Sequence, residues 1–318
     1  MVCSTYERAH RLPALFEALS TQTFEPSRLE IVVVNDGSKD NSAEVLAKLA
    51  ADSSLRVCVI NQPTNRGAAS GRNAGVRAAR GRVIAFTDDD CAPQPQWLEA
   101  GVRALGASAG RVVVGRTDPN PDQSRNRGPF SRTLRVNERT GAFFMQTCNI
   151  FYFRADLEAA GGFNGAFTGA GGEDTDLGWR VIGLGRELVF EPEALVFHDV
   201  HPGGFSDAVR DVMRSRFIPQ LASLHRQRFR AAMTHRFFWS RSHERIALMF
   251  VGLLAAVALW APVPLVAALP WAFDRLGRRA MTRGRLRRVA YLPHAFVLDL
   301  VELGATAFGA LRHRFLIL

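Results

Sequence analysis

The chain has few cysteines and lacks the features of a disulfide-bonded or zinc-stabilised protein. Only four cysteines occur in 318 residues, and none has a cysteine or histidine nearby at zinc-site spacing. Their scatter predicts reduced, mostly buried thiols, as in a cytosolic protein. We expect no signal peptide, because a charged, proline-containing segment follows Met1 almost at once. We therefore expect the N-terminal part to work in the cytosol.

Net positive charge is absent from the first two thirds of the chain. Residues 1–205 carry 22 Lys and Arg against 24 Asp and Glu, whereas residues 206–318 carry 18 against 6. The formal net charge of +10 therefore comes from the last third. Nucleic acid is one partner for a basic region, but these arginines alternate with apolar stretches and form no compact nucleic-acid motif. The pattern favours anionic lipid head groups as the partner.

Along residues 1–205, short apolar runs alternate with segments whose apolar residues recur at helical spacing. This rhythm predicts an α/β domain with a mainly parallel, doubly wound sheet and helices on both faces. In such domains, ligands bind outside the carboxyl ends of the strands. The expected strands are 29–34, 55–60, 83–86, 111–116, further strands within 141–154, and 188–200. The expected helices are 12–21, 42–50, a short one after the Gly/Asn-rich segment 65–75, and one from about 173 to 185.

Three consecutive aspartates, Asp88, Asp89 and Asp90, follow the apolar run 83–86. Like charges at this density repel, so we expect a cation beside them. Mg²⁺ and Mn²⁺ prefer carboxylate oxygens and often share their coordination shell with substrate phosphates. The alternative is an acidic turn or helix cap, since aspartate is common in both.

An ordered series of short motifs over about residues 2–205 resembles the family 2 glycosyltransferases, which have the GT-A fold. Each motif is weak alone, and their order makes the resemblance specific. The motifs are Ser4-Thr5-Tyr6-Glu7-Arg8, Val34-Asn35-Asp36-Gly37-Ser38, Asn65-Arg66-Gly67 with Arg72-Asn73-Ala74-Gly75, Asp88-Asp89-Asp90, Gly161-Gly162-Phe163, and Glu173-Asp174-Thr175-Asp176-Leu177-Gly178-Trp179-Arg180. The resemblance implies an inverting hexosyltransferase that uses a nucleoside diphosphate sugar as donor.

The resemblance also implies roles for residues that bind the donor. Thr5 and Glu7 would line the nucleotide pocket, Asp36 would accept a hydrogen bond from the base, and Asp88 would hold the ribose. Arg72 would add a positive contact near the phosphates, and its alternative is a solvated helix arginine.

For the metal, the resemblance points to Asp90, the last acid of the family's DxD signature, with Asp89 left to a structural role. A bound Mn²⁺ or Mg²⁺ ion would neutralise charge on the leaving diphosphate. His198 follows the apolar run 194–197, where many relatives carry a histidine near the metal, and His201 comes shortly after it. The alternative for each is a histidine without a ligand role.

Asp174 matches the family's catalytic base, which takes the proton from an acceptor hydroxyl. Neighbouring acids such as Glu173 and Asp176 would raise its affinity for a proton. The alternative is an acidic helix N-terminus stabilised by the helix dipole. We assign Glu173 and Trp179 to the acceptor side, although a buried core aromatic is the alternative for Trp179.

The last third divides into a basic helical segment at 206–245, an apolar stretch at 246–273, and a basic loop with an amphipathic helix at 274–318. The stretch has about 28 residues, enough for one membrane span. A single span would carry seven arginines, between 275 and 288, away from the cytosol, against the positive-inside rule. A hairpin turning near 261–264 avoids this, and a buried helical pair is the alternative. Residues 291–311 include two acids and predict an interfacial helix instead of a second span.

The basic segment before the apolar stretch lacks the Gln-x-x-Arg-Trp signature of the family's processive members. We therefore expect a single sugar transfer to a lipid-linked or cell-envelope glycan acceptor, at the cytoplasmic face of the membrane. The competing hypothesis is a membrane-tethered protein that binds nucleotide sugars without catalysis.

Overall fold

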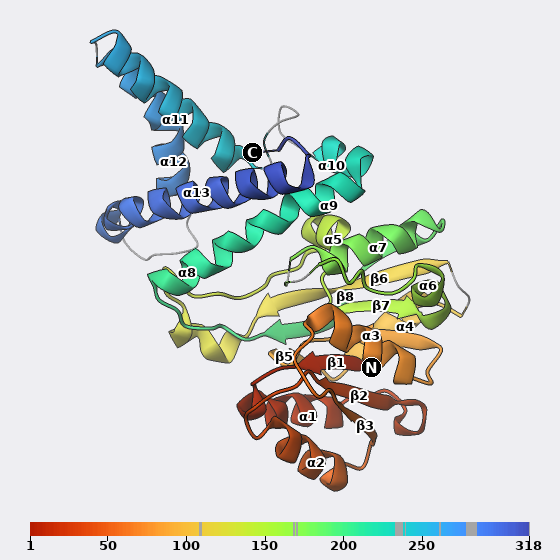
Figure 1. Cartoon of the computed structure of the whole chain (residues 1–318). Helices are drawn as coiled ribbons and strands as arrows, with labels where there is room; N and C mark the ends of the chain where they lie inside the picture. The colour runs from red at the N-terminus through yellow and green to blue at the C-terminus, as the bar shows by residue number, and fades with distance from the viewer. Residues whose placement is uncertain are drawn as a thin grey trace. The chain divides into compact units, whose positions relative to one another are not determined.

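The computed structural model describes residues 1–107, 110–167, 169, 171–232, 238, 240–260, 262–277 and 285–317. These residues form two compact units (Figure 1). The first unit is Met1–Arg125 with Thr133–Val200, and the second is Asn126–Arg132 with His201–Leu318.

An eight-stranded mixed sheet forms the centre of the first unit, in the order β3-β2-β1-β4-β7-β6-β8-β5. The strands are β1 (Val2–Thr5), β2 (Glu30–Asn35), β3 (Arg56–Asn61), β4 (Val83–Phe86), β5 (Cys91–Pro93), β6 (Arg111–Pro119), β7 (Ile150–Phe153) and β8 (Glu187–His198). Strands β3, β2, β1 and β4 are parallel, as are β6 and β8, whereas β7 and β5 run antiparallel to their neighbours. The mainly parallel α/β class is therefore confirmed.

The α-helices described in the first unit are α1 (Leu12–Ser20), α2 (Ser42–Asp52), α3 (Ala68–Ala78), α4 (Trp97–Leu105), α5 (Glu138–Phe144), α6 (Arg154–Ala159) and α7 (Glu173–Gly183). They alternate with the strands as far as β4, as the sequence predicts, whereas α4, α5 and α6 lie where the sequence predicted no helix. Because β1 lies between β2 and β4 and is parallel to both, the carboxyl ends of these three strands meet at one edge of the sheet.

The Gly/Asn-rich segment 65–75 differs from its prediction. We expected a helix only after this segment, but α3 begins inside it, at Ala68. Two glycines explain the difference, since a Cβ atom on Gly71 would lie 2.2 Å from Ser4 Oγ, and one on Gly75 would lie 2.4 Å from Val2 Cγ1. Glycine is therefore required here for close packing of α3 on β1, and this packing outweighs its low helix propensity.

The expected strands within 141–154 are wrong before residue 150, because residues 141–144 belong to helix α5 and residues 145–149 are irregular. A capping box starts this helix: the Asn137 side chain accepts a hydrogen bond from the Thr140 backbone N–H, and the Thr140 hydroxyl accepts one from the Asn137 N–H. Only Ile150–Phe153 is a strand, and it is fully buried between β4 and β6.

The second unit is helical. Its helices are α8 (Phe205–Val212), η4 (Met213–Phe217), α9 (Ile218–Leu224), α10 (Arg226–Ala232), α11 (Arg241–Ala258), η5 (Val263–Ala268), α12 (Leu269–Gly277) and α13 (Arg285–His313). The apolar stretch 246–273 thus includes the end of α11, all of η5 and the start of α12, with a break between α11 and η5. Residue 261 and the basic loop at 278–284 lie outside the described residues.

One helix segment in the described part of the chain, Val289–His313, is long and apolar enough to cross a membrane. It includes the residues for which the sequence predicted an interfacial helix. About a third of its most apolar window is buried inside the protein. A core helix passes the same test of length and composition, so the interfacial placement of 291–311 stays a prediction.

Candidate functional site

Polar side chains gather where β1, β2 and β4 end. Thr5 is the last residue of β1, Asp36 follows β2, and Asp88 comes two residues after β4. Apolar strands hold these positions, because the central residues of β2, including Val32 and Val33, are completely buried. The sheet therefore fixes the starting points of the three loops that form the site.

Asp36 is buried and organises the loop before α3. Its two carboxylate oxygens accept hydrogen bonds from the backbone N–H groups of Arg66, at 3.0 Å, and Gly67, at 2.8 Å. Asp36 therefore holds this loop in place. The hydrogen bond expected between Asp36 and the nucleotide base stays a prediction.

The loop after β1 is also tightly held. Glu7 has a φ of +52°, in the left-handed region that non-glycine residues rarely adopt, and its backbone N–H donates to Ser38 Oγ at 2.9 Å. Strained residues of this kind persist where the surrounding structure fixes them, often at ligand sites. This placement agrees with Glu7 lining a nucleotide pocket.

A guanidinium group lies between two of the three aspartates. Arg8 Nη1 donates to Asp89 Oδ1 at 2.6 Å and to Asp90 Oδ2 at 2.9 Å. Thr5 Oγ1 donates to the other oxygen of Asp89 at 2.6 Å. Burial alone would lower the pKa of Arg8, but the charges of Asp89 and Asp90 raise it well above its usual value. Burial raises the pKa of Asp89 despite this partner.

The repulsion among the aspartates predicts a cation beside them, but Arg8 was not among the predicted site residues. The signal was present, since Arg8 ends the Ser4–Arg8 motif that resembles the family. Its contacts give Asp89 the structural role that was expected, because both of its carboxylate oxygens are used inside the protein.

Arg72 connects the aspartate run to helix α7. Its Nη2 lies 2.9 Å from Asp88 Oδ1, its Nη1 lies 3.2 Å from Glu173 Oε1, and its guanidinium lies 5.8 Å from the centre of the Phe163 ring. Burial alone would lower the pKa of Arg72, but Asp88 and Glu173 raise it overall, so the group stays charged. The alternative of a solvated helix arginine is wrong, because Arg72 is buried.

Asp174 lies in the first turn of α7, beside this network. Burial raises its pKa to about 7, the charge of Glu173 adds to the rise, and Arg72 opposes it. The Thr175 backbone N–H donates to Asp174 Oδ1 at 2.7 Å. A carboxylate with this pKa can take up and release a proton near neutral pH, as a general base must.

His198 ends β8 and is brought next to Asp90 by strand pairing. Cys91 of β5 pairs with His198, and the Asp199 N–H donates to the Asp90 carbonyl at 2.8 Å. His198 Nε2 lies 3.5 Å from Asp90 Oδ1, while Nδ1 lies 2.9 Å from the Asp199 carbonyl oxygen. Donation from Nδ1 to that carbonyl leaves a lone pair on Nε2, facing Asp90.

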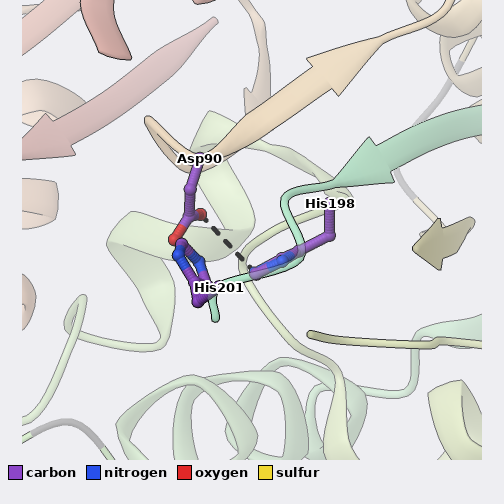
Figure 2. Close-up of side chains that lie close together, drawn as sticks. All are labelled: Asp90, His198 and His201. Carbon is purple, nitrogen blue, oxygen red and sulfur yellow. Dashed lines mark ion pairs between the residues drawn. The ribbon is translucent and has the colours of Figure 1, made fainter. Parts of the chain in front are cut away.

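Figure 2 shows Asp90, His198 and His201 converging, and the dashed line marks the 3.5 Å approach of His198 Nε2 to Asp90 Oδ1. Each residue offers one ligand atom, and these atoms lie within 4.8 Å of one another. One carboxylate oxygen and two imidazole nitrogens are a suitable donor set for a divalent metal. The residues present therefore fit the expected ion, with His201 as a third candidate ligand.

The two residues assigned to the acceptor side lie inside the first unit. Glu173 is buried, where it contacts Arg72 and accepts the Gly171 N–H at 2.7 Å. Trp179 is also buried and packs edge-to-face on Phe143, with ring centres 5.0 Å apart. The structure thus agrees with the alternative for Trp179, a core aromatic.

Sequence comparison places this chain among sugar transferases. The model of "Glycosyl transferase family 2" matches residues 1–161. The chain is 26% identical to glycosyltransferase AglE of Haloferax volcanii over 211 residues, which are 64% of this chain and 67% of that protein. It is 28% identical to validoxylamine A glucosyltransferase of Streptomyces hygroscopicus over 281 residues, 77% of this chain and 62% of that protein. The chain thus matches about two thirds of the length of these relatives.

Solved structures show the same fold at lower sequence identity. Mannosyltransferase PcManGT from Pyrobaculum calidifontis, in complex with GDP-Man and Mn²⁺, has a TM-score of 0.60 at 17% identity and covers 98% of this chain and 86% of its own. Residues 1–349 of S. aureus TarS, in complex with UDP-GlcNAc, give 0.53 at 14% identity, covering 99% of this chain and 91% of their own. With its family model matched over half its length, the chain is a GT-A glycosyltransferase that belongs to glycosyl transferase family 2.

Proposed function

We propose that this protein is a metal-dependent, inverting hexosyltransferase that moves one sugar from a nucleoside diphosphate sugar to a lipid-linked or cell-envelope acceptor. The observation that carries the proposal is the network around Arg72. It joins Asp88, at the end of β4, to Glu173, at the start of α7. The donor-side acid and the candidate base Asp174 therefore belong to one electrostatic cluster.

The reaction assigned to this cluster is a single displacement. An acceptor hydroxyl oxygen forms a bond to the anomeric carbon as the bond to the diphosphate oxygen breaks on the opposite face, which inverts the configuration. Asp174 takes the hydroxyl proton on a carboxylate oxygen. Its raised pKa supports this role, since a base works best when its pKa lies near the working pH.

The donor would bind along the ends of β1, β2 and β4. Thr5, Glu7 and Asp36 would face the nucleoside, with Asp88 at the ribose and Arg72 near the phosphates. Asp90, His198 and His201 would hold Mn²⁺ or Mg²⁺, which neutralises charge on the leaving diphosphate when bound. The complexes of PcManGT with GDP-Man and Mn²⁺ and of TarS with UDP-GlcNAc support a donor of this class.

A membrane-borne acceptor and a place on the cytoplasmic membrane face agree with the composition of the last third. Its arginines and apolar helices suit lipids as partners, and the region has no nucleic-acid motif.

A panel of nucleotide sugars tests the proposal. The purified protein, with Mn²⁺, is expected to be stabilised against heat by one donor and to hydrolyse it slowly when no acceptor is present. Binding without any turnover, in the presence of membrane extract as an acceptor source, would favour the non-catalytic alternative. No stabilisation by any donor would contradict both hypotheses.

The pH dependence of transfer should reflect Asp174. We expect kcat/KM to be constant well above pH 7 and to fall tenfold per pH unit well below it, because protonated Asp174 cannot accept the acceptor proton. Since Glu173 raises the pKa of Asp174, Glu173→Gln should shift the midpoint to lower pH. A profile that is flat from pH 5 to 9 would argue against Asp174 as the base.

Asp174 should also affect stability, with a defined sign. A carboxyl group with a raised folded-state pKa contributes stability that is fully present below its unfolded pKa of about 4. This contribution is lost as the pH rises through about 7. Comparing chemical denaturation of wild type and Asp174→Asn across this range isolates the contribution of Asp174, since asparagine does not titrate.

A further inference from the structure

We propose that α11 and α12 form a hairpin that inserts into one leaflet of an anionic lipid bilayer without crossing it, while α13 stays packed within the protein. This deepens the membrane association proposed above by naming the inserted element. It does not depend on the chemistry of sugar transfer.

The hairpin carries a concentration of exposed apolar side chains. Trp260, at the turn, is 96% exposed, and Leu254 and Val257 on α11 are 70% and 68% exposed. Residues 246–273 contain no charged residue. The exposed large apolar residues described on the hairpin are Leu248, Val251, Leu253, Leu254, Val257, Leu259, Trp260, Val266, Leu269 and Phe273. Monomeric soluble proteins rarely expose apolar groups together in this way.

The far part of α11 lies beside η5 and projects beyond α13 (Figure 1), and α12 follows η5 and packs on α13. From Ile246 to Trp260 the chain rises about 22 Å at 1.5 Å per residue. The hydrocarbon core of a bilayer is about 30 Å thick. The hairpin is therefore long enough to enter this core but too short to cross it, and both of its ends stay on the same side.

Polar contacts mark the base of the hairpin. Arg245, just before the uncharged stretch, forms an ion pair with Asp274, just after it. Arg275 pairs with Asp299 of α13, and Trp271 Nε1 donates to the same carboxylate at 2.7 Å. The apolar side chains at the base pack on α13, in a cluster around Ile246, Trp271 and Ala295. Charged residues thus mark the end of the hairpin that joins the protein, and the exposed apolar residues lie between them in sequence.

Helix α13 has the composition of a span, but its contacts hold it in the protein. Asp299 and Thr306 are buried, and Ser215 Oγ donates to the Glu302 carbonyl at 3.1 Å. A Cβ atom on Gly309 would lie 2.2 Å from the Arg216 carbonyl oxygen, so α13 packs closely on η4. A span surrounded by lipid would have to give up these contacts.

Charge complementarity selects lipid over a protein partner. Residues 206–318 carry 18 Arg and Lys against 6 acids, and many of these arginines lie on either side of the hairpin in sequence. Basic groups next to an inserted apolar element attract anionic lipid head groups.

Vesicle flotation tests the inserted element. The full chain should float with phosphatidylglycerol/phosphatidylcholine vesicles, and Leu254→Glu with Val257→Glu should reduce the bound fraction at least tenfold. Both side chains are mostly exposed, so the folded structure should persist and donor-induced thermal stabilisation should be unchanged. Leu311→Glu, at an 82% exposed site on α13, is the matched control and should bind nearly as wild type.

Three outcomes would overturn the proposal. Loss of flotation with Leu311→Glu but not with the hairpin variant would make α13 the anchor. Equal flotation of all variants would show that the hairpin does not bind the membrane. No flotation, together with a dimer in light scattering that the hairpin variant converts to monomer, would assign the surface to a second copy. None of these outcomes bears on donor turnover, which is measured separately.

Labelling of sealed vesicles tests the depth of insertion. In a Cys58→Ser background, which removes the exposed native thiol, cysteine is introduced before the hairpin by Arg214→Cys or after it by Arg312→Cys. An impermeant maleimide added outside should label both variants to the extent seen in detergent. Protection of the Arg312→Cys variant alone would show that the chain crosses the bilayer.

Discussion

Replacing Asp174 by asparagine should lower kcat for sugar transfer about a thousandfold and leave donor binding intact. General bases contribute about 10²- to 10⁴-fold to enzymatic rates, and asparagine cannot accept the proton. The change is nearly isosteric and keeps an oxygen that can accept the Thr175 N–H. Steady-state transfer, with donor affinity measured by calorimetry on the same protein, separates the two effects.

Asp176 offers a matched control on the same helix. It is buried and pairs with Arg180 at 2.7 Å. Asp176→Asn should reduce stability, with a much smaller effect on kcat in the folded fraction. Transfer by the Asp174→Asn variant within tenfold of the wild-type rate would remove Asp174 from the role of base.

Loss of the metal should have the second largest effect. Asp90→Asn removes the carboxylate from the candidate donor set and should lower kcat about a hundredfold or more, because a bound metal contributes several kcal/mol and each 1.4 kcal/mol is tenfold. The variant should also lose the thermal stabilisation that Mn²⁺ gives the wild type. This second measurement reports metal binding independently of activity.

His10→Ala is a suitable control, since His10 is exposed and outside the candidate donor set. It should keep both activity and the response to Mn²⁺. Full activity of the wild type after chelation with EDTA would contradict a metal requirement. If Mn²⁺ stabilised the Asp90→Asn variant against heat as much as it stabilises the wild type, the ion would have to bind at another site.

The first unit could be predicted well because its signals are local. Short β-branched runs such as 31–34 favour a buried strand, and the motif order places acids at strand ends. The failures came from tertiary packing and capping. Helix α3 forms despite its glycines because β1 requires them, and α5 starts at an Asn–Thr capping box that apolar periodicity does not reveal.

The partners within the site were harder to predict than its members. Asp88, Asp90, Asp174 and His198 were predicted from motifs, but no motif states which cation contacts which acid. Arg8, in the loop after β1, and Arg72, on α3, contact different acids because of where the fold places each arginine. In the second unit, composition could not distinguish a lipid-facing helix from one packed on protein, because both are apolar.

The close approach of α3 to β1 has a consequence for how this enzyme can change. A Cβ atom at Gly71 would meet the Ser4 hydroxyl and one at Gly75 would meet a Val2 methyl group, so a side chain at either position requires those groups or the helix to shift. Arg72 lies between the two glycines on the same helix, and its ion pairs with Asp88 and Glu173 depend on where that helix packs. We therefore expect a substitution at either glycine to disturb both ion pairs together.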